Sequence, residues 1–93
     1  MINTTTISLN YIKKDQLTGS YKGMRYRLAK VNDEIEVIIW PEPFNFFTTS
    51  EDKKQKKMFS LNNEGKEKAV EWLNNQYTDQ KSLWDLAMHT PQI

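Results

Sequence analysis

Cysteine is absent from this chain, and histidine and glycine are scarce. The lack of cysteine excludes a disulfide framework, an iron–sulfur cluster, thiol catalysis and thiolate zinc sites. The single histidine, His89, excludes a metal site built from several histidines. The three glycines, at positions 19, 23 and 65, form neither a phosphate-binding loop nor a dinucleotide fingerprint, and they disfavour an acetyl-coenzyme A loop. We therefore expect a non-enzymatic protein with no catalytic residues, no metal site and no cofactor.

Long apolar runs are missing as well. No stretch approaches the roughly 18 consecutive apolar residues that a membrane-spanning helix needs. The start of the chain lacks a basic segment followed by an apolar one, which is the pattern of a signal peptide. The sequence therefore predicts a cytoplasmic protein without a membrane partner.

Aromatic and charged side chains are what the chain does contain. Of its 93 residues, 38% are apolar, 27% are charged and 12% are aromatic, and the mean hydropathy is −0.77. Because a disordered chain is poor in aromatics, this composition predicts one small folded domain over residues 1–93. The core of such a domain is modest, which favours a partner, or a homodimer, that covers part of its surface.

Charge is distributed in blocks of alternating sign. The formal net charge is +5 over residues 1–30, −6 over 31–52, +4 over 53–68 and −2 over 69–93. One interpretation is that neighbouring strands of opposite charge pair with each other. The other is that separate basic and acidic surfaces meet a partner.

Alternating apolar and polar residues predict an antiparallel sheet over residues 17–61, preceded by an N-terminal strand or arm over 1–16. The N-terminal strand is expected to join the sheet or to pair with another copy. A loop around Gly19 is expected at 17–22, a hairpin turn at Asn32-Asp33 and a polar turn at 50–54. The predicted strands cover residues 7–11, 23–31, 34–40, 44–49 and 57–61, and the lysines of the last one indicate an edge strand.

Helical periodicity appears in the last third of the chain. Asn62 or Asn63 is a capping residue, and an apolar stripe follows over residues 63–77 that should lie on the sheet. The stripe consists of Ala69, Trp72, Leu73, Gln76 and Tyr77. Thr78 or Asp79 is a second cap, and a short second helix follows within a helical part that covers 62–90. The fold class is therefore α+β, with a three- to four-stranded antiparallel sheet packed by one main C-terminal helix and a short second helix.

Two surfaces are candidates for binding. The acidic block lies around an aromatic segment and could imitate a run of phosphates in the basic cleft of a partner, with exposed aromatic rings as anchors. Its candidate residues are Glu34, Glu36, Trp40, Glu42, Phe44 and Phe47. The alternative is a basic strand face with an interleaved tyrosine, which suits phosphates and stacked bases. Its candidate residues are Tyr21, Lys22, Arg25, Arg27, Lys53, Lys54, Lys56 and Lys57.

The stretches LTGSYKGMRYRL, IIWPEPFNF and NNEGKEKAVEWLNNQY resemble a group of small uncharacterised proteins from phages and integrative elements of low-GC Gram-positive bacteria. The resemblance covers residues 17–77 and carries no catalytic residues. It implies an accessory protein of a mobile element, and small cysteine-free proteins of that setting often bind and block host machinery, as anti-CRISPR proteins do.

Two functions follow as expectations. The first is a non-enzymatic inhibitor that binds a host-defence protein or ribonucleoprotein, such as a CRISPR effector. The second is a small module that binds nucleic acid through the basic strand face.

Overall fold

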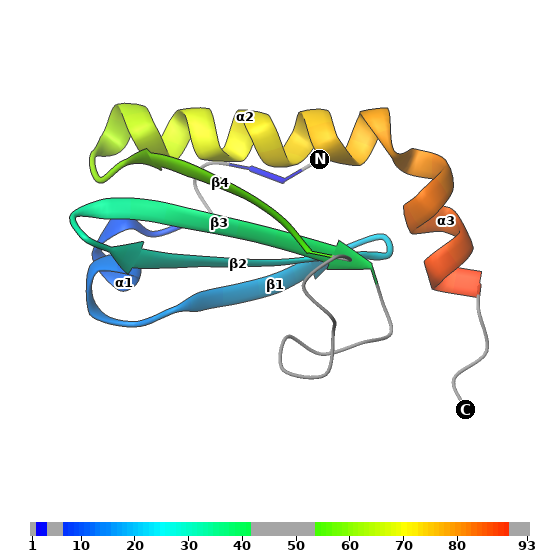
Figure 1. Ribbon diagram of the computed structural model, residues 1–93, viewed down its shortest axis with the longest axis horizontal. Coiled ribbons are helices and arrows are strands. Elements are labelled where there is room, and N and C mark those ends of the chain that lie inside the picture. Colours follow the sequence, from blue (N-terminus) through cyan, green and yellow to red (C-terminus); the bar gives the residue numbers. More distant parts are fainter. Residues whose placement is uncertain (1, 4–6, 42–53, 90–93) are drawn as a thin grey trace.

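The computed structural model describes residues 2–3, 7–41 and 54–89, with side chains up to Leu86. Four strands form one open antiparallel sheet in the order β1-β2-β3-β4, and a long helix lies across one face of it (Figure 1). This is the α+β class that the sequence predicts. The elements are α1 (Leu9–Lys14), β1 (Leu17–Tyr21), β2 (Met24–Val31), β3 (Glu34–Pro41), β4 (Gln55–Ser60), α2 (Asn63–Asp79) and α3 (Lys81–His89).

The central hairpin of β2 and β3 forms where alternation predicts it. The two strands pair along their whole length, with Leu28 opposite Val37. Asn32 and Asp33 make the turn with φ values of 50° and 64°. Positive φ at both central residues is typical of the two-residue turns whose twist matches that of the strands. The hairpin turn predicted at these two residues is confirmed.

The predicted loop at 17–22 is wrong, because the chain forms strand β1 there. Gly19 lies within the strand opposite Tyr26, and the turn falls at Lys22 and Gly23, whose φ values are 45° and 95°. A Cβ on Gly19 would lie 2.5 Å from Tyr26 Oη, so this glycine makes room for the tyrosine ring across the strand pair. The sheet therefore includes strand β1, which was not predicted because glycine is typical of turns and loops.

The strand predicted at 7–11 is also wrong, since residues 9–14 form α1. Ser8 caps this helix, and its Oγ accepts a hydrogen bond from the N–H of Tyr11 at 3.2 Å. Because residues 9–14 are helical, Ile12 faces the core and is buried, although it lies beyond the strand predicted at 7–11. Because β1 pairs only with Met24–Leu28, the rest of that edge of β2 is flanked by α1. The short N-terminal helix thus replaces the expected strand.

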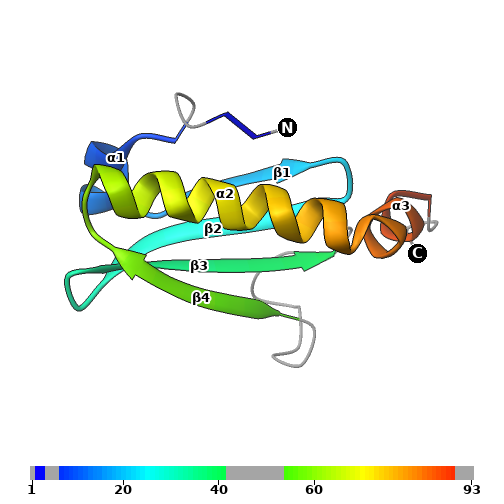
Figure 2. The ribbon, with the colours of Figure 1, turned by 90° about the horizontal axis from the view of Figure 1, so that it is seen from above.

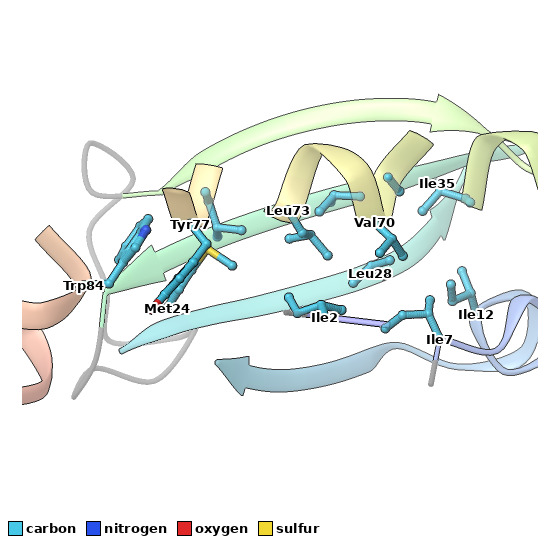
Figure 3. Close-up of a cluster of buried hydrophobic side chains, with 13 residues drawn as sticks. Ile2, Ile7, Ile12, Met24, Leu28, Ile35, Val70, Leu73, Tyr77 and Trp84 are labelled. Carbon is cyan, nitrogen blue, oxygen red and sulfur yellow. The ribbon is translucent and has the colours of Figure 1, made fainter. Parts of the chain in front are cut away.

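The inner face of the sheet, which is the face turned toward α2, carries the core. Asn62 caps α2 as predicted, because its Oδ1 accepts a hydrogen bond from the N–H of Gly65 at 2.7 Å. Of the predicted stripe, Ala69, Leu73 and Tyr77 are buried and the other two residues are partly buried. They pack on side chains of β2 and β3 (Figure 3). The fully buried strand residues of this face are Met24, Leu28, Ile35, Val37 and Ile39.

Helix α3 closes one end of this core. Helix α2 continues through Thr78 and Asp79, so neither residue caps a second helix as predicted, and Gln80 separates the two helices. Trp84 is fully buried, and its Nε1 donates to the carbonyl of Gln76 at 3.1 Å. A Cβ on Gly23 would lie 2.1 Å from the carbonyl oxygen of Trp84, which shows how closely the β1–β2 turn approaches α3.

The side chain of Asn74 on α2 holds the backbone of Ile2 in the N-terminal arm. Asn74 Oδ1 accepts the N–H of Ile2 at 2.9 Å, and Asn74 Nδ2 donates to the carbonyl of Ile2 at 2.9 Å. Ile2 is buried against the core.

Strand β4 is the last strand of the sheet, and the segment that precedes it is only partly described. Strand β4 confirms the last predicted strand and its edge position. The strand at 44–49 and all but the last residue of the turn at 50–54 lie outside the described residues. Across the described ranges, no helix combines the length and the apolar character needed to span a membrane.

Candidate binding surface

The outer face is the face of the sheet turned away from α2. Helix α2 covers the inner face, while α1 and α3 lie toward opposite ends of the sheet (Figures 1 and 2). Since side chains alternate along each strand, the register assigns each residue to one face. The outer-face residues are Thr18, Ser20, Arg25, Arg27, Ala29, Val31, Glu34, Glu36, Ile38, Trp40, Lys56, Met58 and Ser60.

Both sets of predicted binding residues contribute to this one face. The acidic set places Glu34, Glu36 and Trp40 here, all from β3. The basic set places Arg25 and Arg27 from β2 and Lys56 from β4. The two surfaces that the sequence offers as alternatives are therefore, in these six residues, a single surface of mixed charge.

Arg27 and Glu36 form an ion pair on this face. Arg27 Nη1 lies 3.5 Å from Glu36 Oε1, and Arg27 Nε donates to Gln16 Oε1. The exposed fractions of the two charged side chains are 20% and 17%. They are diagonal neighbours on adjacent strands, a position that favours opposite charges. This ion pair joins the basic block at 1–30 to the acidic block at 31–52, so the interpretation that neighbouring strands of opposite charge pair is confirmed for Arg27 and Glu36.

Charge on the outer face changes sign along the strands. Arg25 stands opposite Trp40, near the β1–β2 turn, and Arg27 and Lys56 both face Ile38 in the next row. Toward the β2–β3 turn, the facing pairs contain Glu36 and then Glu34. The face is therefore basic toward one end and acidic toward the other. The two ends adjoin directly, because Ile38 lies in the row of Arg27 and Lys56, and the next row holds Glu36 between Ala29 and Met58.

Trp40 is not presented as an exposed anchor. Only 3% of its surface is exposed, although it points to the outer face. The other aromatic candidates, Phe44 and Phe47, and the acid Glu42 lie outside the described residues. Ala29 and Ile38 are buried as well, so among the described residues the outer face exposes mainly charged and polar side chains rather than an open ring.

The other basic candidates do not join this surface. Tyr21 packs edge-on against Tyr77, with ring centroids 4.8 Å apart and an interplanar angle of 77°, and it borders the core. Lys22 lies in the turn, 5.4 Å from the Tyr21 ring, and Lys57 lies on the inner side of β4, 5.7 Å from the Phe59 ring. Lys54 directly precedes β4, and Lys53 falls outside the described residues. Tyr21 thus takes part in packing, and its stacking role stays a prediction.

Groups with shifted pKa values lie away from the outer face. Burial raises the pKa of Tyr26, which points to the inner face. A hydrogen bond to Asp85 raises the pKa of Lys81 on α3, where the Nζ–Oδ2 distance is 2.7 Å. No cluster of three or more potential metal-ligating side chains occurs in the described part of the chain.

Sequence reasoning missed the surroundings of α1. Two hollows, of about 520 Å³ and about 300 Å³, lie on either side of this helix, and Lys13 lines both. The signals for a helix were present in the sequence, namely a serine at the cap position and lysines in the last turn, but they were outweighed by a five-residue alternation.

Comparisons of this chain with protein-family models, with curated proteins and with solved structures found no match.

Proposed function

We propose that this protein is a non-enzymatic inhibitor that acts by binding, and that the outer face of its sheet is the surface that meets the partner. The observation that carries the proposal is the convergence of candidate residues on one face. Glu34 and Glu36, together with Arg25, Arg27 and Lys56, stand on that face, and α2 covers the opposite one.

The arrangement suits a large partner better than a small substrate. Alternate residues of a strand are about 6.6 Å apart, so Glu34 and Glu36 make a short row of carboxylates on a broad surface. Neither residue lines the two hollows beside α1. A row of carboxylates suits a basic cleft, and the basic end of the same face suits an acidic or phosphate-bearing neighbour.

A ribonucleoprotein offers both kinds of charge, because its protein grooves are basic and its nucleic acid is acidic. The resemblance to mobile-element proteins supplies the setting, which is host defence. The specific partner we propose is a CRISPR effector bound to its guide RNA.

The test is inhibition of target-DNA cleavage by a panel of purified CRISPR effector complexes, together with binding measured by biolayer interferometry. The informative variant is Glu34→Gln/Glu36→Gln. Its matched control is Glu67→Gln/Glu71→Gln, which removes two exposed carboxylates from the solvent side of α2. We expect the first variant to bind at least tenfold more weakly and the control to bind as the wild type does.

Either of two results would overturn the proposal. One is that no complex in the panel is bound or inhibited at a large molar excess of the wild-type protein. The other is that the outer-face variant and the control inhibit equally well.

A further inference from the structure

Helix α1 lies at the end of the molecule where α2 begins (Figure 1), and several lysines lie around it. Lys13 and Lys66 line the hollow of about 520 Å³ between the starts of α1 and α2. Lys13 also lines the hollow of about 300 Å³ on the other side of α1, together with Lys14 and Lys30. We call Tyr11, Lys13, Lys14, Lys30 and Lys66 the α1 patch. The fold brings its members together from α1, β2 and α2.

Most cations of the α1 patch are not engaged by carboxylates. Lys13, Lys14 and Lys66 make no ion pair with any residue that the structure describes. Lys30 has a long contact of 3.9 Å with Asp33, whose carboxylate is 93% exposed. Such a surface contact contributes little. These lysines differ from Arg27, which Glu36 and Gln16 hold.

The acids at this end leave the patch positive. The hollow of about 520 Å³ has no aspartate or glutamate in its lining, and the hollow of about 300 Å³ has only Asp15. The carboxylate of Asp15 accepts the N–H of Gln16 at 2.7 Å, and Glu64 is paired with Lys68 at 3.2 Å. The local field therefore favours an anion over a cation.

An exposed aromatic ring lies beside one of these cations, Lys14. Tyr11 is 49% exposed, which places it among the most exposed large apolar side chains that the structure describes. It precedes Lys14 by three positions on α1, so the two side chains are neighbours on the solvent side of the helix. An open tyrosine beside lysines supplies the two elements that a single strand of nucleic acid uses, a ring for a base and cations for phosphates.

We propose that the α1 patch binds single-stranded nucleic acid, with Tyr11 stacking on a base and Lys13, Lys14 and Lys66 contacting successive phosphates. This binding surface is separate from the outer face of the sheet and goes beyond the function proposed above. It uses other residues than the basic strand face that the sequence predicts, where Tyr21 packs against Tyr77 and Arg27 is paired with Glu36.

The test uses fluorescence anisotropy with a labelled 20-nucleotide single strand of DNA or RNA, at salt concentrations from low to physiological. The variant is Lys13→Gln/Lys14→Gln/Lys66→Gln. The control, Lys22→Gln/Lys57→Gln/Lys81→Gln, removes the same charge from the β1–β2 turn, β4 and α3. Circular dichroism melting checks that both variants fold.

The wild type should bind with an affinity that falls steeply with salt. Losing three phosphate contacts should lower the slope of log K against log salt by about 2, because each contact on a single strand contributes roughly 0.7. The control should keep the wild-type slope. Tyr11→Ala should weaken binding at least about fivefold, whereas Tyr11→Phe should retain it, since stacking uses the ring and not the hydroxyl.

Four results would overturn the inference. These are no binding of any single strand at low salt, an equal loss in the α1 variant and the control, tighter binding of duplex than of single strands, and equal binding of poly-glutamate. The last two would show that the patch is a surface for other polyanions and that Tyr11 does not stack. The lysine variants of the α1 patch leave Glu34 and Glu36 intact. A negative result for nucleic-acid binding by the α1 patch can therefore be distinguished from a negative result for the inhibitor proposal.

Discussion

The two faces of the same strands differ in what holds their side chains. On the inner face of β3, Ile35, Val37 and Ile39 are fully buried beneath α2. On the outer face, the next residues along the chain include Glu34, which is exposed, and Glu36, which is paired with Arg27. The first half of β3 therefore contributes to the core through Ile35 and Val37 and to a charged surface through Glu34 and Glu36, whereas the outer side chains of its second half, Ile38 and Trp40, are buried. The difference teaches that stability and binding can be changed separately in β3.

The sharpest way to break this comparison is to truncate adjacent residues on opposite faces. Ile35→Ala removes a fully buried side chain from the inner face and should cost about 2–5 kcal/mol of unfolding free energy. Glu34→Ala, one residue earlier, should stay within about 0.5 kcal/mol of the wild type. Urea denaturation followed by circular dichroism measures both values. Equal losses would contradict the division between the faces.

The end of the inner face near α3 is tested by Gly23→Ala. The φ of 95° at Gly23 disfavours any side chain, and the added Cβ would lie 2.1 Å from the carbonyl oxygen of Trp84. We expect a loss of about 2–3 kcal/mol, since the left-handed backbone alone costs about 1–2 kcal/mol. Asp33→Gly, at a φ of 64° in the other turn of β2, is the control and should be neutral or slightly stabilising. A neutral Gly23→Ala variant would show that α3 does not pack closely on this turn.

A smaller effect is expected from the ion pair of the outer face. Glu36→Gln removes the charge that faces Arg27 but keeps the shape of the side chain, so the loss of stability should be at most about 1 kcal/mol. High salt should reduce the difference from the wild type further. Thermal melts at low and high salt measure both effects. A loss above about 2 kcal/mol, which is twice the ceiling expected for such pairs, would mean that Glu36 and Arg27 are held as core residues are.

The smallest effect concerns pH. Burial raises the pKa of Tyr26 above its ordinary value of 10.0, so the folded state favours the neutral phenol. Well below pH 10.0 the phenol is neutral in both the folded and the unfolded chain, so its ionisation does not change the free energy of unfolding. As the pH rises above 10.0, Tyr26 loses its phenol proton in the unfolded chain before it does so in the folded one. The free energy of unfolding of the wild type should therefore fall until the pH passes the raised pKa of the folded state. Tyr26→Phe should lack this component. Parallel loss in both proteins would contradict the assignment.

Strong local patterns made much of the fold predictable. Strands β2 and β3 follow from long alternation, and α2 follows from a capping asparagine and an apolar stripe. Gly19 was misleading because glycine usually marks a turn, whereas here it accommodates the Tyr26 ring within a strand. The alternation at 7–11 was too short to distinguish a strand from the helix that Ser8 caps.

The candidate surface was predictable only in part. Alternation correctly placed Arg25, Arg27 and Glu36 on one face once β2 and β3 were paired. It gave no information about the burial of Trp40 or the packing of Tyr21 on Tyr77, because both depend on residues distant in the chain. The grouping of Lys13 with Lys66 depends on the tertiary arrangement of α1 and α2, which no local pattern contains.

We expect the outer face to bind the partner through Glu34 and Glu36, while the inner face stabilises the fold. The most direct test measures, for Glu34→Gln/Glu36→Gln, both the melting temperature and the dissociation constant for a CRISPR effector complex that the wild type binds. We expect a melting temperature close to that of the wild type and binding at least tenfold weaker. An unchanged dissociation constant, or a melting temperature that falls as far as that of Ile35→Ala, would contradict it.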